Sequence, residues 1–392
     1  MKRRNFFRYV ALGSFGLTGV LAGNHSLASS YSSKTRSHHR WVVLYWMPYD
    51  NNLVHFGEPI VEMLTHGTQN SDTAVVIQSD YWGDEKMRRR HLVNGTNNET
   101  PIEVEDSSDV NAFSAYLNWA NQTFEAEHWA VIIVGHGGTL NKVSPDEHGK
   151  TGQAKTWMRV DQFAEAVNRF NNATKERVEL LFLQNCNKAT LEVVYEVRDC
   201  ANYTLASQRD LGAPNYYYKG LLKQLNNPET GGKEAAIAIM DSESADMYHT
   251  LTLVDNQVVE RIPEELSKAL KPIISSNLQS VKLSELPTYR YFGEQHCDVV
   301  ALLDYLSQLS NQGKEESINF VDFLRSSVIA SYKTGGELYG YPPSNKSVLE
   351  NLCGLSLYIP RTAQDASFYS SLALYQEVDL VSLYKKMLDS TV

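Results

Sequence analysis

The sequence contains few of the features that mark several large protein classes. Only four of its 392 residues are cysteines, too few for a disulfide-built scaffold but enough to supply one reactive thiol. Lys and Arg number 36 against 46 acidic residues, a net charge of −10, so we expect no nucleic-acid partner. No HExxH, CxxC or EF-hand loop occurs, so we expect no metal or cofactor site. The remaining composition, 42% hydrophobic and 21% charged, is that of a globular protein.

The first 28 residues have the composition of an export signal. Residues 1–8 (MKRRNFFR) carry four positive charges and no acid, and the apolar stretch that follows is too short to span a bilayer comfortably. Ser26 and Ala28 are small residues at the positions that a signal peptidase recognises. The twin arginines followed by aromatic residues resemble a bacterial Tat signal, with a Sec signal or an uncleaved anchor as alternatives. We therefore expect export through the Tat machinery to the periplasm or the exterior of a bacterium, with membrane contact only through an uncleaved signal.

The chain after residue 40 alternates between strand-like and helix-like segments, while residues 29–40 are polar and predict a flexible arm. The strand-like runs are apolar on consecutive residues, as in strands buried on both faces of a parallel sheet. Strands are predicted at 41–47, 73–78, 129–134, 178–183 and 203–206, and helices at 53–64, 110–119, 160–170 and 189–197. This pattern predicts an α/β domain over residues 41–250, with a mostly parallel sheet between helices and functional residues beyond the carboxyl ends of its strands.

The character of the sequence changes after about residue 250. Further strands are predicted at 250–254 and 355–359, and long amphipathic helices at 260–274, 299–309 and 318–332. We interpret residues 251–392 as a C-terminal α/β subdomain packed on the first.

Two of the predicted strands end in residues that can carry out chemistry. His136 follows the run VIIVG and is flanked by glycines, and Cys186 follows LLFLQN at a predicted strand-to-helix turn, where a helix N-terminus favours thiolate. A thiol and an imidazole together satisfy the needs of nucleophilic catalysis, and the backbone N–H groups of Gly137 and Cys186 are candidate oxyanion donors. Either residue alone is weak evidence, because a lone buried cysteine is usually structural.

These strand ends, together with several other segments, resemble the clostripain family, in the clan of cysteine peptidases that includes caspases, gingipains and legumain. The similar segments are YDNNL at 49–53, VIQSD at 76–80, ASQ at 206–208, TLTLVD at 250–255 and GLSLYIP at 354–360. The resemblance spans about residues 41–390. It implies a caspase-like fold and hydrolysis of peptide or protein substrates, with His136 as acid/base and Cys186 as the nucleophile of a thioacyl-enzyme mechanism. Calcium use is implied by this resemblance only.

The chain departs from the family at positions that determine substrate preference. Clostripain-like enzymes typically carry an acid two residues before the catalytic cysteine, where this chain has Gln184, and a second acidic position corresponds to Gln208. Caspases have Gln-Ala-Cys at the nucleophile and arginines in the pocket, so Gln184 and Arg209 permit a similar pocket. We predict cleavage after neutral or acidic residues rather than strictly after Arg or Lys. Alternatively, Gln184 only binds a neighbouring loop and Asp210 supplies the charge of the pocket.

The polar loop 139–156 contains three possible processing sites, Lys142, Lys150 and Lys155, or it stays uncut. Residues 50–52 (DNN) are interpreted as a helix cap and turn, with a role near the site implied by resemblance alone.

Two rival functions stay open on the sequence. One is a catalytically silent relative that binds peptides or cell-surface components in the same cleft. The other is a structural periplasmic protein with disulfide-bonded thiols, although we expect Cys200 to be buried and free.

Overall fold

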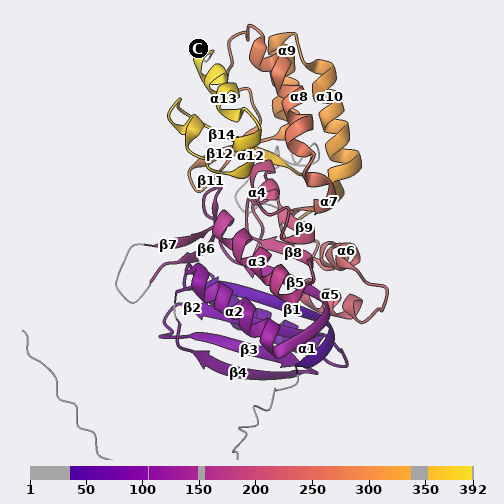
Figure 1. The fold of residues 1–392 in the computed structure, drawn as a ribbon. Coiled ribbons are helices and arrows are strands. Elements are labelled where there is room, and N and C mark those ends of the chain that lie inside the picture. The colour runs from indigo at the N-terminus through magenta and orange to yellow at the C-terminus, as the bar shows by residue number, and fades with distance from the viewer. Residues whose placement is uncertain (1–35, 105, 149–154, 337–351, 391–392) are drawn as a thin grey trace, which may run out of the picture. The chain divides into compact units, whose positions relative to one another are not determined.

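The consecutive apolar runs form the centre of a nine-stranded sheet, counted over the residues that the structure describes (Figure 1). The computed structural model describes residues 36–104, 106–148, 155–336 and 352–390. The predicted signal at 1–28, the first part of the predicted arm and Lys150 lie outside these ranges. The strand order is β13-β10-β9-β8-β5-β1-β2-β3-β4. The strands are β1 (Ser37–Tyr49), β2 (Ala74–Tyr81), β3 (Met87–Val93), β4 (Thr96–Ile102), β5 (Phe124–Val134), β8 (Val178–Gln184), β9 (Ala201–Ser207), β10 (His249–Asp255) and β13 (Ile329–Gly335).

The inner strands β2, β1, β5, β8 and β9 are parallel, and antiparallel strands extend the sheet at both edges. Alternate residues of β1 enter two separate hydrophobic cores, since Leu44 and Trp46 face one and Val43 and Tyr45 face the other. One core is covered by α1 (Gly57–Gly67), α5 (Tyr218–Leu225) and α6 (Gly232–Ser242), and the other by α2 (Val110–Thr123), α3 (Val160–Thr174) and α4 (Leu191–Glu196). The predicted α/β fold, a mostly parallel sheet between helices, is confirmed.

The C-terminal segment contributes to the central sheet and also builds a smaller one. The predicted boundary at residue 250 falls inside β10, and both β10 and β13 belong to the main sheet, so this sheet crosses the boundary. The smaller sheet has the order β11-β12-β14, with β11 (Thr288–Tyr291), β12 (Glu294–Asp298) and β14 (Ser356–Ile359). The other elements are β6 (Lys142–Asp146), β7 (Thr156–Arg159), α7 (Asn256–Val259), α8 (Ile262–Ser275), α9 (Val299–Ser310), α10 (Lys314–Phe323), α12 (Ala373–Glu377) and α13 (Leu380–Asp389).

Two segments differ from their prediction. Residues 37–40, predicted as part of the arm, begin β1, because Ser37 and His39 pair with Phe124 and Ala126 of β5. The helix predicted over 318–332 ends with α10 and a π-helical turn at 324–328, and β13 follows. Antiparallel pairing with β10 makes residues 329–335 a strand, so the sheet edge overrides the local helical spacing.

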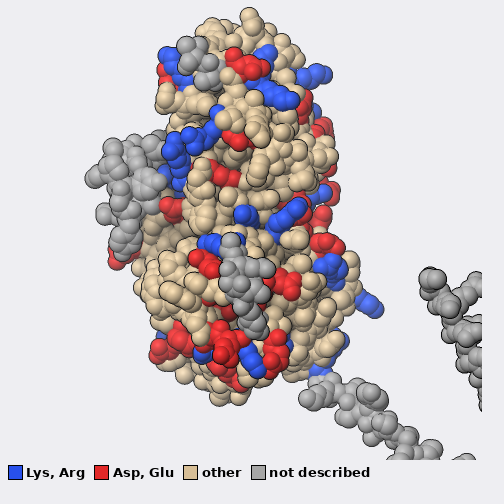
Figure 2. All heavy atoms as spheres, turned by 90° about the vertical axis from the view of Figure 1, so that its left-hand side faces the viewer, with Lys and Arg blue, Asp and Glu red and all other residues tan. Residues whose placement is uncertain are grey.

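Acidic and basic side chains are interspersed over the face shown in Figure 2. Among the described residues, no helix has the length and hydrophobicity needed to cross a bilayer.

Candidate active site

The strands that lead to His136 and Cys186 are neighbours in the sheet. β5 and β8 pair in parallel, and Val134 lies opposite Gln184 at the end of the ladder. His136 and Cys186 therefore each lie two residues beyond the same paired position. This is the carboxyl edge of the parallel strands, where active sites of α/β sheets are found.

The side chain of Asn185 and a close approach of the backbone hold the two strand ends together. Asn185 Nδ2 donates hydrogen bonds to the carbonyl oxygens of Gly135 (2.8 Å) and His136 (3.1 Å). A Cβ atom on Gly137 would lie 2.1 Å from the carbonyl oxygen of Cys186, so only glycine permits this approach. The structure thus brings the His136–Gly137 segment into contact with the Cys186 segment.

The imidazole of His136 is oriented by Asn52, which the sequence pattern indicates as part of a turn and for which only the family resemblance implied a role near the site. Nε2 of His136 lies 2.7 Å from Oδ1 of Asn52. Because that oxygen can only accept, Nε2 carries the proton and Nδ1 holds the lone pair of the neutral ring. Partial burial lowers the pKa of His136, and the charge of Lys155 lowers it further, whereas Glu147 opposes them. The neutral ring is therefore able to accept a proton near pH 7.

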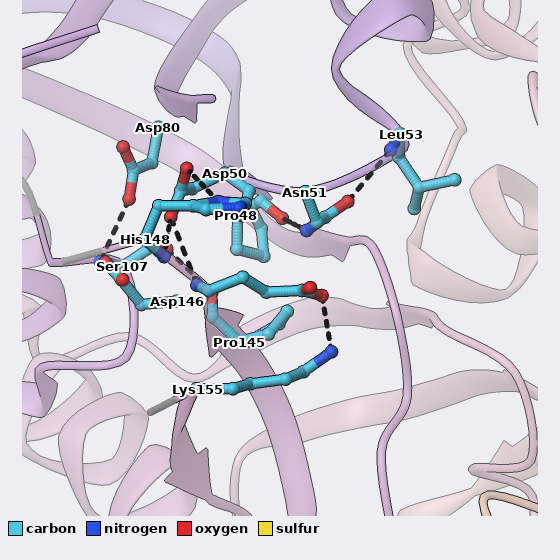
Figure 3. Close-up of polar contacts among 11 residues, drawn as sticks. Pro48, Asp50, Asn51, Leu53, Asp80, Ser107, Pro145, Asp146, His148 and Lys155 are labelled. Carbon is cyan, nitrogen blue, oxygen red and sulfur yellow. Dashed lines mark hydrogen bonds and ion pairs between the residues drawn. The ribbon is translucent and has the colours of Figure 1, made fainter. Parts of the chain in front are cut away.

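The turn that carries Asn52 is fixed by its neighbour in the chain. Asn51 is buried, its Nδ2 donates to the carbonyl oxygen of Pro48 (2.9 Å), and its Oδ1 accepts from the N–H of Leu53 (3.0 Å; Figure 3). The sequence signal for Asn52 was its position just beyond the carboxyl end of β1, the strand beside β5.

A group of buried carboxylates lies beside this turn (Figure 3). Asp50 follows β1, and its Oδ2 accepts the N–H of His148 (2.6 Å). The N–H of Ser107 contacts both Asp80 (3.2 Å) and Asp146 (3.3 Å). Burial is the main cause that raises the pKa of Asp80 to about 8, and the charges of Asp146 and Asp50 add to it. Within the described ranges, no group of three or more His, Cys, Asp and Glu side chains is arranged to hold a metal ion.

The thiol of Cys186 is protonated at neutral pH in this conformation. Its sulfur accepts a hydrogen bond from the N–H of Leu211 (3.3 Å). Burial raises the pKa of Cys186 to about 11, and the nearby charge of Asp210 adds to this rise, while Leu211, Tyr291 and Lys188 oppose it. The expected stabilisation of thiolate by a helix N-terminus is wrong, because α4 has only six residues and begins at Leu191, well past the cysteine.

The glycine loop that follows His136 is anchored by Lys188, a residue that sequence reasoning missed. Lys188 is fully buried, and its Nζ donates to the carbonyl oxygens of Thr139 (2.8 Å) and Leu140 (3.2 Å). The N–H of Leu140 donates to Glu294 Oε2 (2.7 Å) on β12. The predicted oxyanion donor in this loop, the N–H of Gly137, donates to the hydroxyl oxygen of Tyr291 (3.1 Å).

Of the four predicted substrate-binding residues, Gln184 and Asp210 lie near Cys186. Gln184 is 5% exposed, and its Nε2 donates to Asn215 Oδ1 (2.6 Å) and to the hydroxyl oxygen of Tyr218 (3.0 Å). Its Oε1 accepts the hydroxyl of Tyr217 (2.6 Å). Gln184 is therefore an uncharged group held by three neighbours, whereas Asp210 is a partly exposed carboxylate beside the thiol.

The side chains of Gln208 and Arg209 are engaged elsewhere. Gln208 is fully buried, and its Nε2 donates to Asp298 (2.8 Å) and Ser356 (2.9 Å). The guanidinium of Arg209 lies 4.9 Å from the ring centre of Tyr289, and it lines a cavity of about 730 Å³ formed mainly by residues 283–295. Neither His136 nor Cys186 lines that cavity.

All four cysteines are free in the structure, so the reading with disulfide-bonded thiols is wrong. Cys186 is partly exposed, and Cys200, Cys297 and Cys353 are buried. The described ends of the polar loop form an antiparallel hairpin of β6 and β7, with Lys142 in β6 and Lys155 paired with Glu147.

A mostly parallel sheet between helices, with a histidine and a cysteine on adjacent strand ends, defines the class of caspase-like cysteine peptidases. The sequence profile of the clostripain family (peptidase family C11) matches residues 45–388, and the chain belongs to this family. It is thus a cysteine peptidase that acts on peptide or protein substrates.

Solved structures share this fold. One is a secreted C11 cysteine protease from Bacteroides thetaiotaomicron in complex with an irreversible peptide inhibitor, at 16% identity and TM-score 0.64, covering 87% of this chain and 99% of that one. Another is an inactive zymogen C11 protease from Parabacteroides distasonis, at 17% identity and TM-score 0.65, covering 87% and 98%. No curated protein sequence matches the chain.

Proposed function

We propose that this chain is an exported cysteine endopeptidase in which Cys186 is the nucleophile and His136 transfers the proton. The observation that carries the proposal is the junction of β5 and β8, where Asn185 ties the two strand ends together and Asn52 fixes the imidazole. This arrangement supplies a nucleophile, an oriented base and a neighbouring backbone donor, which acyl transfer requires.

The chemical steps follow from these positions. Nδ1 of His136 takes the proton of the Cys186 thiol as the sulfur bonds to the peptide carbonyl carbon, and the N–H groups of Gly137 and Cys186 stabilise the oxyanion. The imidazolium then protonates the leaving amine, which leaves a thioacyl-enzyme. Neutral His136 next removes a proton from water, which attacks the thioester and releases the acid and the thiol. Burial raises the pKa of the Cys186 thiol, so a base is needed to remove its proton, and His136 is the base placed to do so.

The primary specificity is not restricted to Arg and Lys. Gln184 supports this, because it is uncharged and its amide already bonds to Asn215, Tyr217 and Tyr218. Preference for an acidic residue gains no support from Arg209, whose guanidinium packs on Tyr289. A neutral residue before the scissile bond fits the described groups best.

Asp210 favours a second candidate specificity, because it places a partly exposed carboxylate beside the thiol. A panel of fluorogenic peptides that differ only in this residue separates the two. We expect neutral residues to be cleaved at least as fast as Arg, with the same order in the wild type and in Asp210→Asn. Selective cleavage after Arg or Lys that Asp210→Asn abolishes would refute the neutral preference and assign the pocket charge to Asp210.

Export is supported by residues 1–28 of the sequence and by the secreted neighbour from Bacteroides thetaiotaomicron, and the Tat route is supported by the twin arginines alone. Replacing the arginines at positions 3 and 4 with lysines separates Tat from Sec. We expect the precursor to accumulate inside the cell, whereas unchanged export would indicate a Sec signal.

Peptide cleavage by matched cysteine variants tests the catalytic assignment. We expect Cys186→Ala and His136→Ala each to lose at least about 1,000-fold in kcat/KM, in the range seen for residues that act as a unit. Cys200→Ala, which removes a buried thiol on α3's side of the core, is the control and retains cleavage. Cleavage that survives in Cys186→Ala would refute the assignment.

A further inference from the structure

The tip of the β11–β12 hairpin lies over the candidate active site. Tyr291 and Glu294 are paired residues at the ends of the two strands, and only Phe292 and Gly293 connect them. Both connecting residues have positive φ, +47° and +82°, as in the tight type I′ turns whose twist matches that of a hairpin. The hairpin therefore presents Tyr291 and Phe292 on a short, defined turn.

The hydroxyl of Tyr291 contacts the two groups that a substrate carbonyl must reach. Its oxygen accepts the N–H of Gly137 (3.1 Å), and the hydroxyl lies near enough to the sulfur of Cys186 to lower the pKa of that thiol. In acyl transfer, the carbonyl oxygen of the scissile bond takes the oxyanion donors while its carbon lies against the nucleophile. The hydroxyl of Tyr291 thus occupies the position of that oxygen.

The neighbouring residue, Phe292, packs on the catalytic base. Its ring centre is 6.3 Å from that of His136 and 5.7 Å from that of Trp157 on β7. Nζ of Lys155 lies 5.5 Å from the ring centre of Phe292, within the range of a cation–π contact. The side chain of Phe292 is 45% exposed, which is unusual for a large apolar group. Its contacts with His136, Trp157 and Lys155 keep it at the surface of the site.

The base of the hairpin is fastened to the same glycine loop. Glu294, the first residue of β12, accepts the N–H of Leu140 and the hydroxyl of Tyr369. The hairpin therefore contacts the glycine loop at both its tip and its base, through Tyr291 and Glu294. Its connecting residue Phe292 contacts the imidazole of His136.

We propose that Tyr291 is an internal competitor of the substrate, so that the tip of the β11–β12 hairpin must move aside before a peptide carbonyl reaches Cys186. The inference rests on the proposed function of Cys186 and Gly137. It assigns to Tyr291 and Phe292 a direct effect on how readily the site binds substrate, and it makes the conformation described here a closed one.

Two substitutions and a matched control test this proposal. Tyr291→Phe removes only the hydroxyl, and Phe292→Asn removes the ring but keeps a residue that tolerates positive φ. Tyr305→Phe removes a hydroxyl that bonds to the backbone of Lys282, outside the cleft. Each protein is treated with a peptidyl acyloxymethyl ketone, which needs the catalytic site, and separately with iodoacetamide, which needs only access to the thiolate. Modification of Cys186 is followed by mass spectrometry, and Phe292→Asn, which keeps the hydroxyl of Tyr291, reports access without removing that neighbour of the thiol.

We expect Tyr291→Phe to be modified two- to tenfold faster than the wild type by both reagents, the range for loss of one hydrogen bond. Phe292→Asn is also faster, and Tyr305→Phe is unchanged. Equal or slower modification of both hairpin variants, with melting temperatures near that of the control, would overturn the proposal. If iodoacetamide reacts faster with the hairpin variants but the ketone modifies none of the proteins, the occlusion holds and the proposed peptidase function fails.

Discussion

Replacing Asn52 with alanine tests whether the orientation of the imidazole matters for catalysis. The substitution removes the Oδ1 acceptor that lies 2.7 Å from Nε2 of His136 and touches no other part of the hydrogen-bonded turn, which Asn51 holds. Without this acceptor the ring can rotate, and its two neutral tautomers become closer in energy. The fraction of molecules with a lone pair on Nδ1 in the productive position therefore falls.

The size of the effect follows from the value of one hydrogen bond. A net 0.5–1.5 kcal/mol corresponds to roughly two- to twelvefold in rate, so we expect kcat to fall about tenfold at most with KM unchanged. Asn52 also accepts from the imidazolium, so its loss lowers the pKa of His136 further, and the acid limb of the pH profile moves to lower pH. Asn52→Asp keeps an acceptor and adds a negative charge, so it retains activity and moves the same limb to higher pH.

The assay is steady-state cleavage of one fluorogenic peptide from pH 5 to 9, with Asn98→Ala on the exposed strand β4 as the control. Wild-type kcat and an unchanged pH profile in Asn52→Ala would show that the Asn52 acceptor does not orient the imidazole. So would a loss in Asn52→Asp as large as that in Asn52→Ala, because the acceptor would then not be what matters.

Two further predictions concern the shape of the site and its buried charge. Gly137→Ala forces a Cβ atom onto the carbonyl oxygen of Cys186, so we expect at least a 100-fold loss of kcat/KM and a lower melting temperature. Gly231→Ala, at a helix cap with negative φ, is the control. Wild-type activity in Gly137→Ala would contradict the close contact between Gly137 and Cys186. The pKa of Asp80 is raised to about 8 on folding. Between about pH 4 and 8, Asp80 is therefore protonated in the native state and ionised in the unfolded chain. The free energy of unfolding therefore decreases as pH rises through this window, by at most about 1.4 kcal/mol per pH unit. Urea unfolding of Asp80→Asn should show a smaller decrease with pH than the wild type, and equal slopes in the two proteins would refute this role of Asp80.

The part of the site that lies on consecutive parallel strands could be predicted from the sequence. Buried strands of the α/β pattern place their carboxyl ends along one edge, and His136 and Cys186 are the chemically active residues directly beyond two of these ends. The same pattern could not say that these two strands are adjacent, because strand order depends on the crossover connections. Pairing of Val134 with Gln184 in the structure supplies that information.

Residues that reach the site from distant segments could not be predicted. Tyr291 lies 154 residues from Gly137, on a hairpin whose strands of four and five residues carry little pattern of their own. Lys188 is a basic side chain whose burial is compensated by backbone carbonyls of another loop and by the carboxylate of Glu294, partners that lie far from it in the sequence. Substrate-binding roles for Gln208 and Arg209 were inferred from position along the chain, and the structure shows Gln208 bonded to Asp298 and the guanidinium of Arg209 packed on Tyr289.

Packing also overrides the sequence signal on the opposite side of the sheet. Arg90 is the last of three consecutive arginines on β3, a run of charge typical of an exposed segment, yet it is 1% exposed. It is buried because its guanidinium pairs with Glu58 on α1 (2.6 Å) and Glu99 on β4 (2.8 Å), partners that only the folded sheet brings together.

The assignment of the nucleophile is tested most directly by locating the covalent bond that a substrate forms. A slowly deacylating peptide ester, mixed with the protein and quenched in acid, traps the thioacyl-enzyme for peptide mapping by mass spectrometry. We expect a single acyl group on Cys186, absent from Cys186→Ala and formed much more slowly in His136→Ala. Acylation of another residue, or ester turnover with no acyl group on Cys186 at any quench time, would contradict it.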